Sequence, residues 1–254
     1  MKKEKTILTF ITSIRHPDNS NDYNGVWNLL RNTLRSICAQ TNENFKVIVV
    51  ANKILDDFKS DPQIKNLEFV EVDFKAPAEK GKVHTTMESL RHDRSTKYVR
   101  GLIHAKKYNS IYTMFVDADD FLSNKLVQYI ADNDKDQNGW TIKDGFVSDL
   151  KKIKPKSDPK SFCGSNIIIN TKLLESEINF SILNNSSTQN EITKSSSKFY
   201  LSRIIGSHKF SVDYFGEKKL PFTTIPFPGT IYHVDTGENH SLAHFRTDLE
   251  NGAH

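Results

Sequence analysis

An apolar, β-prone run that ends in three carboxylates constrains the fold of this chain more than any other stretch. Residues 111–116 are Ile-Tyr-Thr-Met-Phe-Val, and Asp117, Asp119 and Asp120 follow directly. The run lacks the strict alternation of a half-exposed strand. It therefore predicts a central strand of an α/β sheet that is covered on both faces. The acids then lie at the carboxyl end of that strand, where open α/β sheets bind ligands.

Two interpretations of the three acids remain open at this point. Carboxylates this close together repel one another unless they are solvated or face a cation. An Asp-x-Asp pair offers oxygen ligands to Mg²⁺ or Mn²⁺, ions that bridge diphosphates. The alternative is an acidic turn before a helix, with Ser123 or Asp120 as the N-cap. The buried strand that precedes the acids favours the metal site.

The composition excludes several classes of protein. The chain has 254 residues, of which 37% are hydrophobic, and a mean hydropathy of −0.54. No apolar run approaches the roughly 18 residues that a membrane span requires. Residues 7–14 are too short and too polar for a signal peptide, so they predict a first strand. The net charge of +4 is too small to indicate a nucleic-acid partner. One large domain, or one domain with an appendage, is expected.

The cysteines and lysines bear on where the protein works. Cys38 and Cys163 form neither a Cys-x-x-Cys metal pair nor a disulfide framework, which predicts a reducing cytoplasm. Lysines gather in residues 151–160 and at 218–219. Such clusters form solvated loops or rest on an anionic membrane surface. The expected location is the cytoplasm, either free or at the inner face of the membrane.

The first half of the chain alternates strands and helices. Strands are predicted at 6–14, 45–52 and 67–74, and a helix at 26–38 has apolar residues at helical spacing. This order predicts a parallel sheet with right-handed crossovers. Residues 76–96 are predicted as a charged loop with at most one helix. A helix at 96–107 then leads into the central strand, and another helix is predicted at 124–131.

The second half has a different character. Strands are predicted at 140–147, 162–170 and 229–234, and short helices at 171–178 and 198–205. Residues 148–161 carry lysines and two prolines and predict an exposed excursion. Residues 181–197 are polar and predict a loop near a helix. No internal repeat is present.

These features resemble the family-2-type glycosyltransferases of the GT-A fold over roughly residues 6–131. The likeness rests on a strand ending in Thr12-Ser13-Ile14-Arg15, a second strand at 47–52, and the hexapeptide Phe115-Val116-Asp117-Ala118-Asp119-Asp120. The hexapeptide looks like the family's apolar-Asp-x-Asp-Asp signature, and a helix with basic residues precedes it.

The resemblance implies a fold and a division of labour. The fold is α/β and GT-A-like (Rossmann-like), with a mostly parallel central sheet flanked by helices and a smaller mixed region on the acceptor side. Residues 1–138 would form the nucleotide-sugar-binding half. Residues 139–254 would form the acceptor-binding half and C-terminal region of the same domain.

The resemblance also implies an activity. The chain would be a metal-dependent glycosyltransferase that uses Mn²⁺ or Mg²⁺ and a nucleotide-sugar donor, with a UDP-linked sugar as the expected donor. The acceptor would be a glycan or a lipid-linked glycan in surface polysaccharide synthesis, and the transfer would invert the anomeric carbon.

Donor-site residues follow from the same resemblance. Asp119 would bind the metal, Asp117 the metal or the ribose, and Asp120 the ion or the donor sugar. Lys97 and Arg100 would bring positive charge to the diphosphate or base; the alternative is a solvated helix face. The remaining nucleotide-binding candidates end the first three strands: Thr12, Arg15, Asn52 and Asp73. Asn52 stands where the family often has an Asp pair for the nucleobase.

Two roles, the further metal ligand and the catalytic base, each have two candidate residues. Either His233 or His240 would complete the metal site, since neutral imidazole binds Mn²⁺; the alternative is a pair of exposed loop histidines. The catalytic base would be His208 or Asp213. His208 lies in Gly206-Ser207-His208-Lys209, roughly where the family has Glu-Asp, and Asp213 has the usual residue type.

Two rival functions keep the assignment open. An apolar-Asp-x-Asp also heads haloacid-dehalogenase-like phosphatases, in which the first Asp is the nucleophile. There the motif follows an early strand, whereas here it follows three strands. The other rival is a non-catalytic nucleotide-sugar-binding protein, which the weakly defined base favours.

Overall fold

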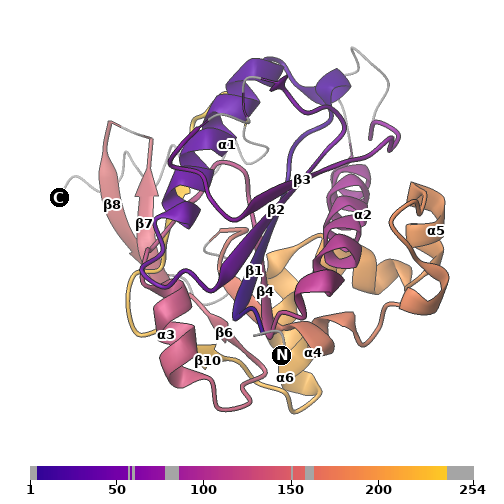
Figure 1. The fold of residues 1–254 in the computed structure, drawn as a ribbon. Helices are drawn as coiled ribbons and strands as arrows, with labels where there is room; N and C mark the ends of the chain where they lie inside the picture. Colours follow the sequence, from indigo (N-terminus) through magenta and orange to yellow (C-terminus); the bar gives the residue numbers. More distant parts are fainter. Residues whose placement is uncertain are drawn as a thin grey trace.

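A seven-stranded sheet lies at the centre of the computed structural model (Figure 1). Its strand order is β10-β6-β9-β4-β1-β2-β3. The structure describes residues 5–56, 58, 61–77, 86–149, 151–157 and 163–238. The strands of this sheet are β1 (Leu8–Ser13), β2 (Phe45–Ala51), β3 (Leu67–Glu71), β4 (Tyr112–Val116), β6 (Gly139–Thr141), β9 (Ile167–Asn170) and β10 (Thr223–Thr224).

The parallel part of the sheet forms as predicted. β1 pairs in parallel with β2 and β4, and β2 pairs in parallel with β3. β9 is inserted antiparallel between β4 and β6. Phe10 of β1 lies opposite Met114 of β4, and both are buried. The missing alternation in the central strands thus has the predicted cause, which is that both faces of the sheet are covered.

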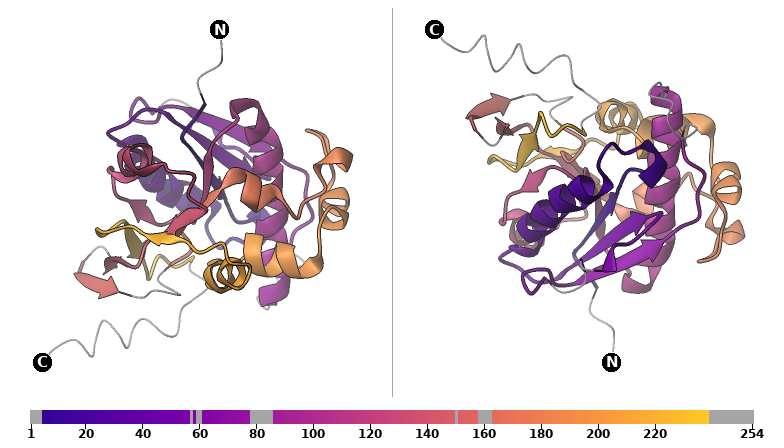
Figure 2. Two further views of the ribbon diagram at one scale, coloured as in Figure 1. Left: turned by 90° about the horizontal axis from the view of Figure 1, so that it is seen from below. Right: turned by 90° about the horizontal axis from the view of Figure 1, so that it is seen from above.

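Helices cover both faces. They are α1 (Tyr23–Cys38), α2 (Met87–Ala105), α3 (Leu126–Asn133), α4 (Thr171–Glu175), α5 (Gln189–Lys194) and α6 (Ser211–Glu217), with a π-helix at Tyr200–Ile205 and short 3₁₀ turns at Pro17–Asn19, Lys106–Tyr108, Phe180–Ile182 and His208–Phe210. Figure 2 shows α1 and α2 on opposite sides of the sheet. Phe10 packs in the core on the α1 side, and its neighbour Ile11 packs in the core on the α2 side.

A second, smaller sheet has the order β5-β11-β7-β8. Its strands are β5 (Phe121–Leu122), β7 (Asp144–Ser148), β8 (Ile153–Ser157) and β11 (Thr230–His233). β11 is parallel to β7 and antiparallel to β5. The sheet is therefore mixed, and the predicted smaller mixed region is confirmed. Within the described ranges, no helix is both long and apolar enough to cross a membrane.

Several predicted boundaries are wrong. The long helix α2 begins at residue 87 with Thr86 as its N-cap, not at 96. Its early turns carry charged side chains that hide the helical pattern. The strand predicted at 140–147 divides into β6 and β7, which belong to different sheets. Residues 153–157 of the predicted excursion form β8, paired antiparallel with β7.

Two further segments differ from the prediction. The polar stretch predicted as a loop near a helix itself contains α5, which begins with a capping box between Thr188 and Glu191. This box is a local N-terminus signal that overrides the low apolar content. The strand predicted at 162–170 is present only from Ile167, and residue 162 lies outside the described residues.

The contact between α2 and the sheet gives a stability test. A Cβ atom on Gly101 would lie 2.5 Å from the side chain of Ile11, because α2 packs directly on β1 there. We expect Gly101→Ala to lower the free energy of unfolding by about 1–3 kcal/mol, as overpacking does. Gly216→Ala in α6 is the matched control, because nothing lies within 4 Å of its added methyl. Urea unfolding that finds both variants equally stable would contradict this packing.

Candidate functional site

A cavity of about 530 Å³ opens at the carboxyl ends of β1 and β4. Its walls come from segments far apart in the sequence, which the fold brings together. The lining residues that carry charged, polar or closely packed groups are Ser13, Arg15, Arg91, Asp93, Arg94, Asp117, Asp119, Cys163, Gly164, Ser207, His208, Lys209, Tyr232 and Glu238. Ligand sites of open α/β sheets lie at this edge.

Residues 117–120, which we call the acid loop, follow β4 and form a tight turn. The N–H of Asp120 donates to the carbonyl oxygen of Asp117 at 3.3 Å. The hydroxyl of Thr33 in α1 donates to the carbonyl oxygen of Ala118 at 2.9 Å. The ring of His233 hydrogen-bonds to the backbone of Asp119. The loop is thus held from both sheets and from α1.

Asp117 is fixed at the cavity wall. Its backbone N–H donates to Ser165 Oγ at 2.9 Å, and its carboxylate lies 3.4 Å from the guanidinium of Arg94. The charge of Asp117 raises the pKa of Arg94. Gly164 packs so closely on the Asp117 carboxylate that an added Cβ would overlap it. Glycine at position 164 therefore leaves room for this carboxylate.

Asp120, the last residue of the acid loop, has a buried side chain. Its Oδ2 accepts a hydrogen bond from Ser165 Oγ at 2.6 Å. Its Oδ1 is buried and has no hydrogen-bond partner within the described part of the chain. Burial raises its pKa well above the ordinary value, and the neighbouring acids add to this effect. A buried carboxyl of this kind supports the loop from below.

Asp119 faces the cavity between opposing charges. Burial raises its pKa to about 7, and the negative charge of Asp117 acts in the same direction. The cations of Arg94 and Arg15 oppose the shift. The carboxylate is therefore partly protonated near neutral pH when no further cation is present.

The donor set fits a hard divalent cation. Asp117 and Asp119 line one cavity and repel each other, so a cation between them would relieve that repulsion. The described residues contain no group of three or more His, Cys, Asp or Glu side chains that could hold a metal. Mg²⁺ commonly takes one or two carboxylates and completes its shell with water and substrate phosphates. Asp117 and Asp119 would hold the ion in that way.

His208 also lines the cavity. Both ring nitrogens are buried and lack hydrogen-bond partners among the residues that the structure describes. Burial lowers its pKa to about 4, and the nearby cations of Arg94, Lys209 and Arg91 act in the same direction. The imidazole is therefore neutral at physiological pH. It can accept a proton, although its low pKa makes it a weak base.

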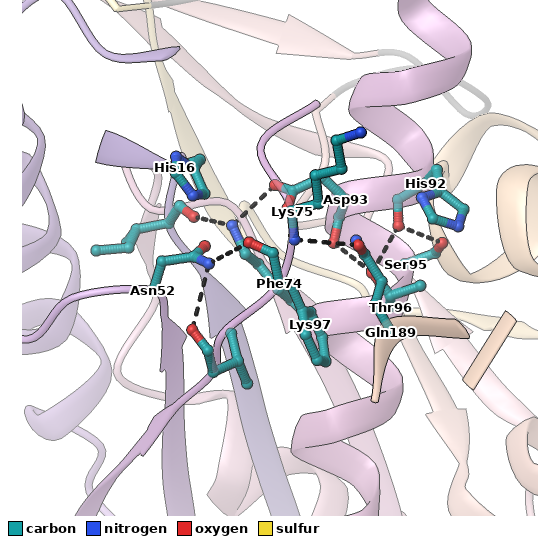
Figure 3. A network of polar contacts seen from close by, with 12 residues as sticks. His16, Asn52, Phe74, Lys75, His92, Asp93, Ser95, Thr96, Lys97 and Gln189 are labelled. Carbon is teal, nitrogen blue, oxygen red and sulfur yellow. Dashed lines mark hydrogen bonds and ion pairs between the residues drawn. The ribbon is translucent and has the colours of Figure 1, made fainter. Parts of the chain in front are cut away.

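Several predicted donor residues do not line the cavity. The ammonium of Lys97 is buried between Asp93 (2.8 Å) and the carbonyl oxygen of Ile14 (3.0 Å) (Figure 3). It therefore holds the end of β1 against α2. Arg100 instead holds Asn185, donating to its side-chain oxygen at 3.1 Å and to its backbone carbonyl. Thr12 is buried within β1.

Asn52 and Asp73 lie beside this network. The amide nitrogen of Asn52 donates to the carbonyl oxygens of Val72 and Phe74, at 3.2 and 2.8 Å (Figure 3). This leaves its Oδ1 buried without a partner among the described residues. Asp73 is exposed. Neither residue belongs to the cavity lining.

The remaining candidates for the metal site and for the catalytic base lie in different places. His233 ends β11, is buried, and contacts the backbone of Asp119. Its pKa is lowered by burial. His240 lies outside the described residues. Asp213 is exposed in the first turn of α6 and does not line the cavity, whereas His208 does.

Sequence reasoning missed important residues of the wall. Arg91 and Arg94 lie on α2 before Lys97, and a correct start of that helix would have drawn attention to them. Gly164 and Ser165 carry no local signal, because their contacts with Asp117 form only when β9 docks beside β4. No sequence pattern singles out Glu238 either.

No family model matches this chain, and no curated protein matches it. Among solved structures, residues 1–349 of S. aureus TarS in complex with UDP-GlcNAc have a TM-score of 0.52 to this chain at 14% identity. The alignment covers 94% of this chain and 61% of that fragment. This chain therefore spans about three-fifths of the TarS fragment that it matches.

Weaker likenesses exist to other proteins. The glycosyltransferase GlyE of Streptococcus pneumoniae has a TM-score of 0.43 at 10% identity, covering 91% of this chain and 55% of its own. Rv0371C of Mycobacterium tuberculosis, in complex with manganese, also has a TM-score of 0.43 at 10% identity, covering 91% and 94%. The TarS likeness concerns the fold. The chain has the GT-A-like α/β architecture that its sequence predicted.

The position of Asp119 predicts how stability depends on pH. Its pKa of about 7 lies above the ordinary 3.8, so folding takes up a proton between these values. The free energy of unfolding therefore falls as the pH rises through this window and is constant above it. The Asp119→Asn variant has no titrating carboxyl at this position and therefore does not lose this stability as the pH rises. Without divalent cations, its melting temperature should exceed that of the wild type by about 2 °C or more at about pH 8, and the difference should shrink as the pH falls towards about 4.

The control for this measurement is Asp132→Asn, which changes an exposed aspartate outside the cavity. It shows the effect of removing one exposed carboxylate at each pH. A difference between Asp119→Asn and the wild type that is independent of pH would contradict the raised pKa.

Proposed function

We propose that this chain is a metal-dependent glycosyltransferase. It moves a sugar from a nucleotide-sugar donor, UDP-linked in our proposal, to a hydroxyl of a glycan or lipid-linked acceptor. The observation that carries the proposal is one cavity lined by Asp117, Asp119 and the neutral His208, whose ring nitrogens have no hydrogen-bond partner among the described residues. The S. aureus TarS structure with a similar fold holds UDP-GlcNAc, which supports the donor class.

The donor would bind beside the acid loop. A divalent ion, when bound by Asp117 and Asp119, neutralises the charge that develops on the leaving diphosphate. Arg94 and Arg15 add fixed positive charge on the same side, and a guanidinium offers the fork geometry that suits phosphate oxygens. Pyrophosphate-type oxyanions are thus favoured ligands of this wall.

The acceptor would approach from the side of His208. Its neutral imidazole accepts the proton of the attacking hydroxyl as that oxygen bonds to the anomeric carbon. One such displacement inverts the configuration at that carbon. Arg91 and Lys209 line the cavity with His208, and their positive charges act on its imidazole. The acceptor side is therefore cationic and favours an acceptor with negative charge nearby.

The rest of the proposal concerns the setting. Residues 1–138 would bind the donor, because they supply Arg15, Arg94 and the acid loop. Residues 139–254 would bind the acceptor, because they supply His208. We propose a role in surface polysaccharide synthesis in the cytoplasm, with contact at the inner face of the membrane. The lysine-bearing hairpin β7–β8 stands out beyond the central sheet (Figure 1) and is the candidate for that contact.

Nucleotide binding tests the donor site. We expect UDP to raise the melting temperature of the wild type in the presence of Mn²⁺, because a ligand of the native state stabilises it by mass action. Asp119→Ala should lose most of this shift. Asp132→Ala should keep it. A panel of nucleoside diphosphates in the same assay identifies the base, and no shift with any of them would contradict the proposed donor site.

Turnover tests His208. We expect His208→Ala to lower the rate of sugar transfer or donor hydrolysis by about 10²-fold or more, the usual contribution of a general base. The stabilisation by UDP should stay unchanged. His104→Ala is the matched control on α2, since His104 pairs with Glu68 and does not line the cavity. A His208→Ala variant with full activity would exclude His208 as the base.

The low pKa of His208 favours one second candidate function. A weak base is compatible with a nucleotide-sugar-binding protein that does not turn its ligand over. Stabilisation by UDP-sugars without hydrolysis or transfer by the wild type would support that function instead.

A further inference from the structure

The chain places one of its own carboxylates in an anion-binding pocket beside the acid loop. Glu238 Oε2 accepts a hydrogen bond from Arg15 Nη1 at 2.6 Å. Its Oε1 accepts from the backbone N–H groups of Asn21 and Asp22, at 3.1 and 2.9 Å. Arg15 Nη2 donates to the backbone carbonyl of Glu238. The side chain of Glu238 is only 10% exposed.

The donors of this pocket belong to the segment between β1 and α1. Arg15 follows β1, and Asn21 and Asp22 lead into the sixteen-residue helix α1. Asp22 is the N-cap of α1, and its side chain makes no capping hydrogen bond. The partial positive charge of the helix start therefore acts on an outside anion. One guanidinium and two N–H groups that converge on two oxygens also match the oxyanions of a phosphate.

The pocket is part of the cavity already described. Arg15 and Glu238 both line it. Arg15 also lies within electrostatic reach of Asp119, because each charge affects the pKa of the other. A phosphate bound at Arg15 would therefore lie next to the proposed metal ligands.

The segment that carries Glu238 is positioned by its backbone. After β11, the N–H of Val234 donates to the carbonyl oxygen of Ser148 at 2.9 Å. Gly237 then has a φ of +79°, a conformation that glycine adopts without steric cost. This turn leads directly to Glu238, whose N–H donates to Thr236 Oγ1 at 3.2 Å. The end of the smaller sheet is thus connected to the entrance of α1.

We infer that Arg15 and the backbone amides of Asn21 and Asp22 form a phosphate-binding subsite that Glu238 occupies in the ligand-free protein. A phosphate-bearing ligand must displace Glu238 to bind there. Glu238 then acts as an internal competitor, and the measured affinity is reduced by the fraction of molecules in which the pocket is closed. That the phosphate belongs to a nucleotide diphosphate rests on the proposed function. The subsite itself does not.

The test measures binding by isothermal titration calorimetry on the full chain. Inorganic pyrophosphate is the phosphate-only probe, UDP carries base and phosphate, and uridine carries no phosphate. We expect Glu238→Ala to bind pyrophosphate about tenfold more tightly than the wild type, since one charge-assisted contact is worth about one such factor. Glu238→Gln should lie between the two. Arg15→Gln should lose pyrophosphate binding.

Controls separate this effect from general changes in charge. Glu43→Gln removes an exposed glutamate paired with Lys65 outside the cavity, and it should bind pyrophosphate like the wild type. Uridine affinity should be the same in the wild type and in both Glu238 variants. Unchanged or weaker pyrophosphate binding by Glu238→Ala would overturn the inference. Absence of pyrophosphate binding by every variant would also overturn it.

The outcomes distinguish this inference from the proposed function. If Glu238→Ala tightens pyrophosphate binding but no variant turns over a UDP-sugar, the subsite stands and the transferase proposal fails. If the wild type transfers sugar but the Glu238 variants bind pyrophosphate and UDP like the wild type, the transferase proposal stands and the competitor role fails.

Discussion

The hydroxyl of Ser165 connects the two parts of the chain on which the site depends. It accepts the N–H of Asp117 and donates to the carboxylate of Asp120, so that residues just before β9 hold the loop after β4. Gly164 beside it leaves room for the Asp117 carboxylate. The antiparallel insertion of β9 next to β4 makes these contacts available. Without that insertion, three neighbouring carboxylates would have no fixed arrangement.

Charge balance shapes the rest of the cavity. The carboxylates of the acid loop repel one another, and Arg94 and Arg15 offset part of that repulsion. Elsewhere in the cavity, burial and the charges of Arg91 and Lys209 keep His208 neutral against the opposing charge of Asp117. Glu238 in turn meets Arg15. The cavity thus holds opposed charges close together, an arrangement that a cation and an anionic ligand would neutralise together.

Sequence patterns predicted some parts of this arrangement better than others. The buried strand before Asp117 and the parallel order of β1, β2 and β4 follow from continuous apolar runs, which are local signals. The sequence pattern starts α2 too late because the first turns of this helix face a polar cavity, so their residues lack an apolar stripe. Lys97 and Arg100 fall inside the predicted helix, whereas Arg91 and Arg94, which line the cavity, fall before it. Spacing alone does not tell which face of a helix meets a site.

The sequence by itself determined the α/β class, the central strand and the position of Asp117 and Asp119 at its carboxyl end. These features depend on hydrophobic periodicity and on the geometry of neighbouring residues, which a linear sequence contains. Only the tertiary structure decided that Ser165 supports the acid loop, that Lys97 is sequestered by Asp93, and that Glu238 meets Arg15. Those contacts join residues up to 223 positions apart, and their partners are selected by the docking of strands and helices, which leaves no local pattern.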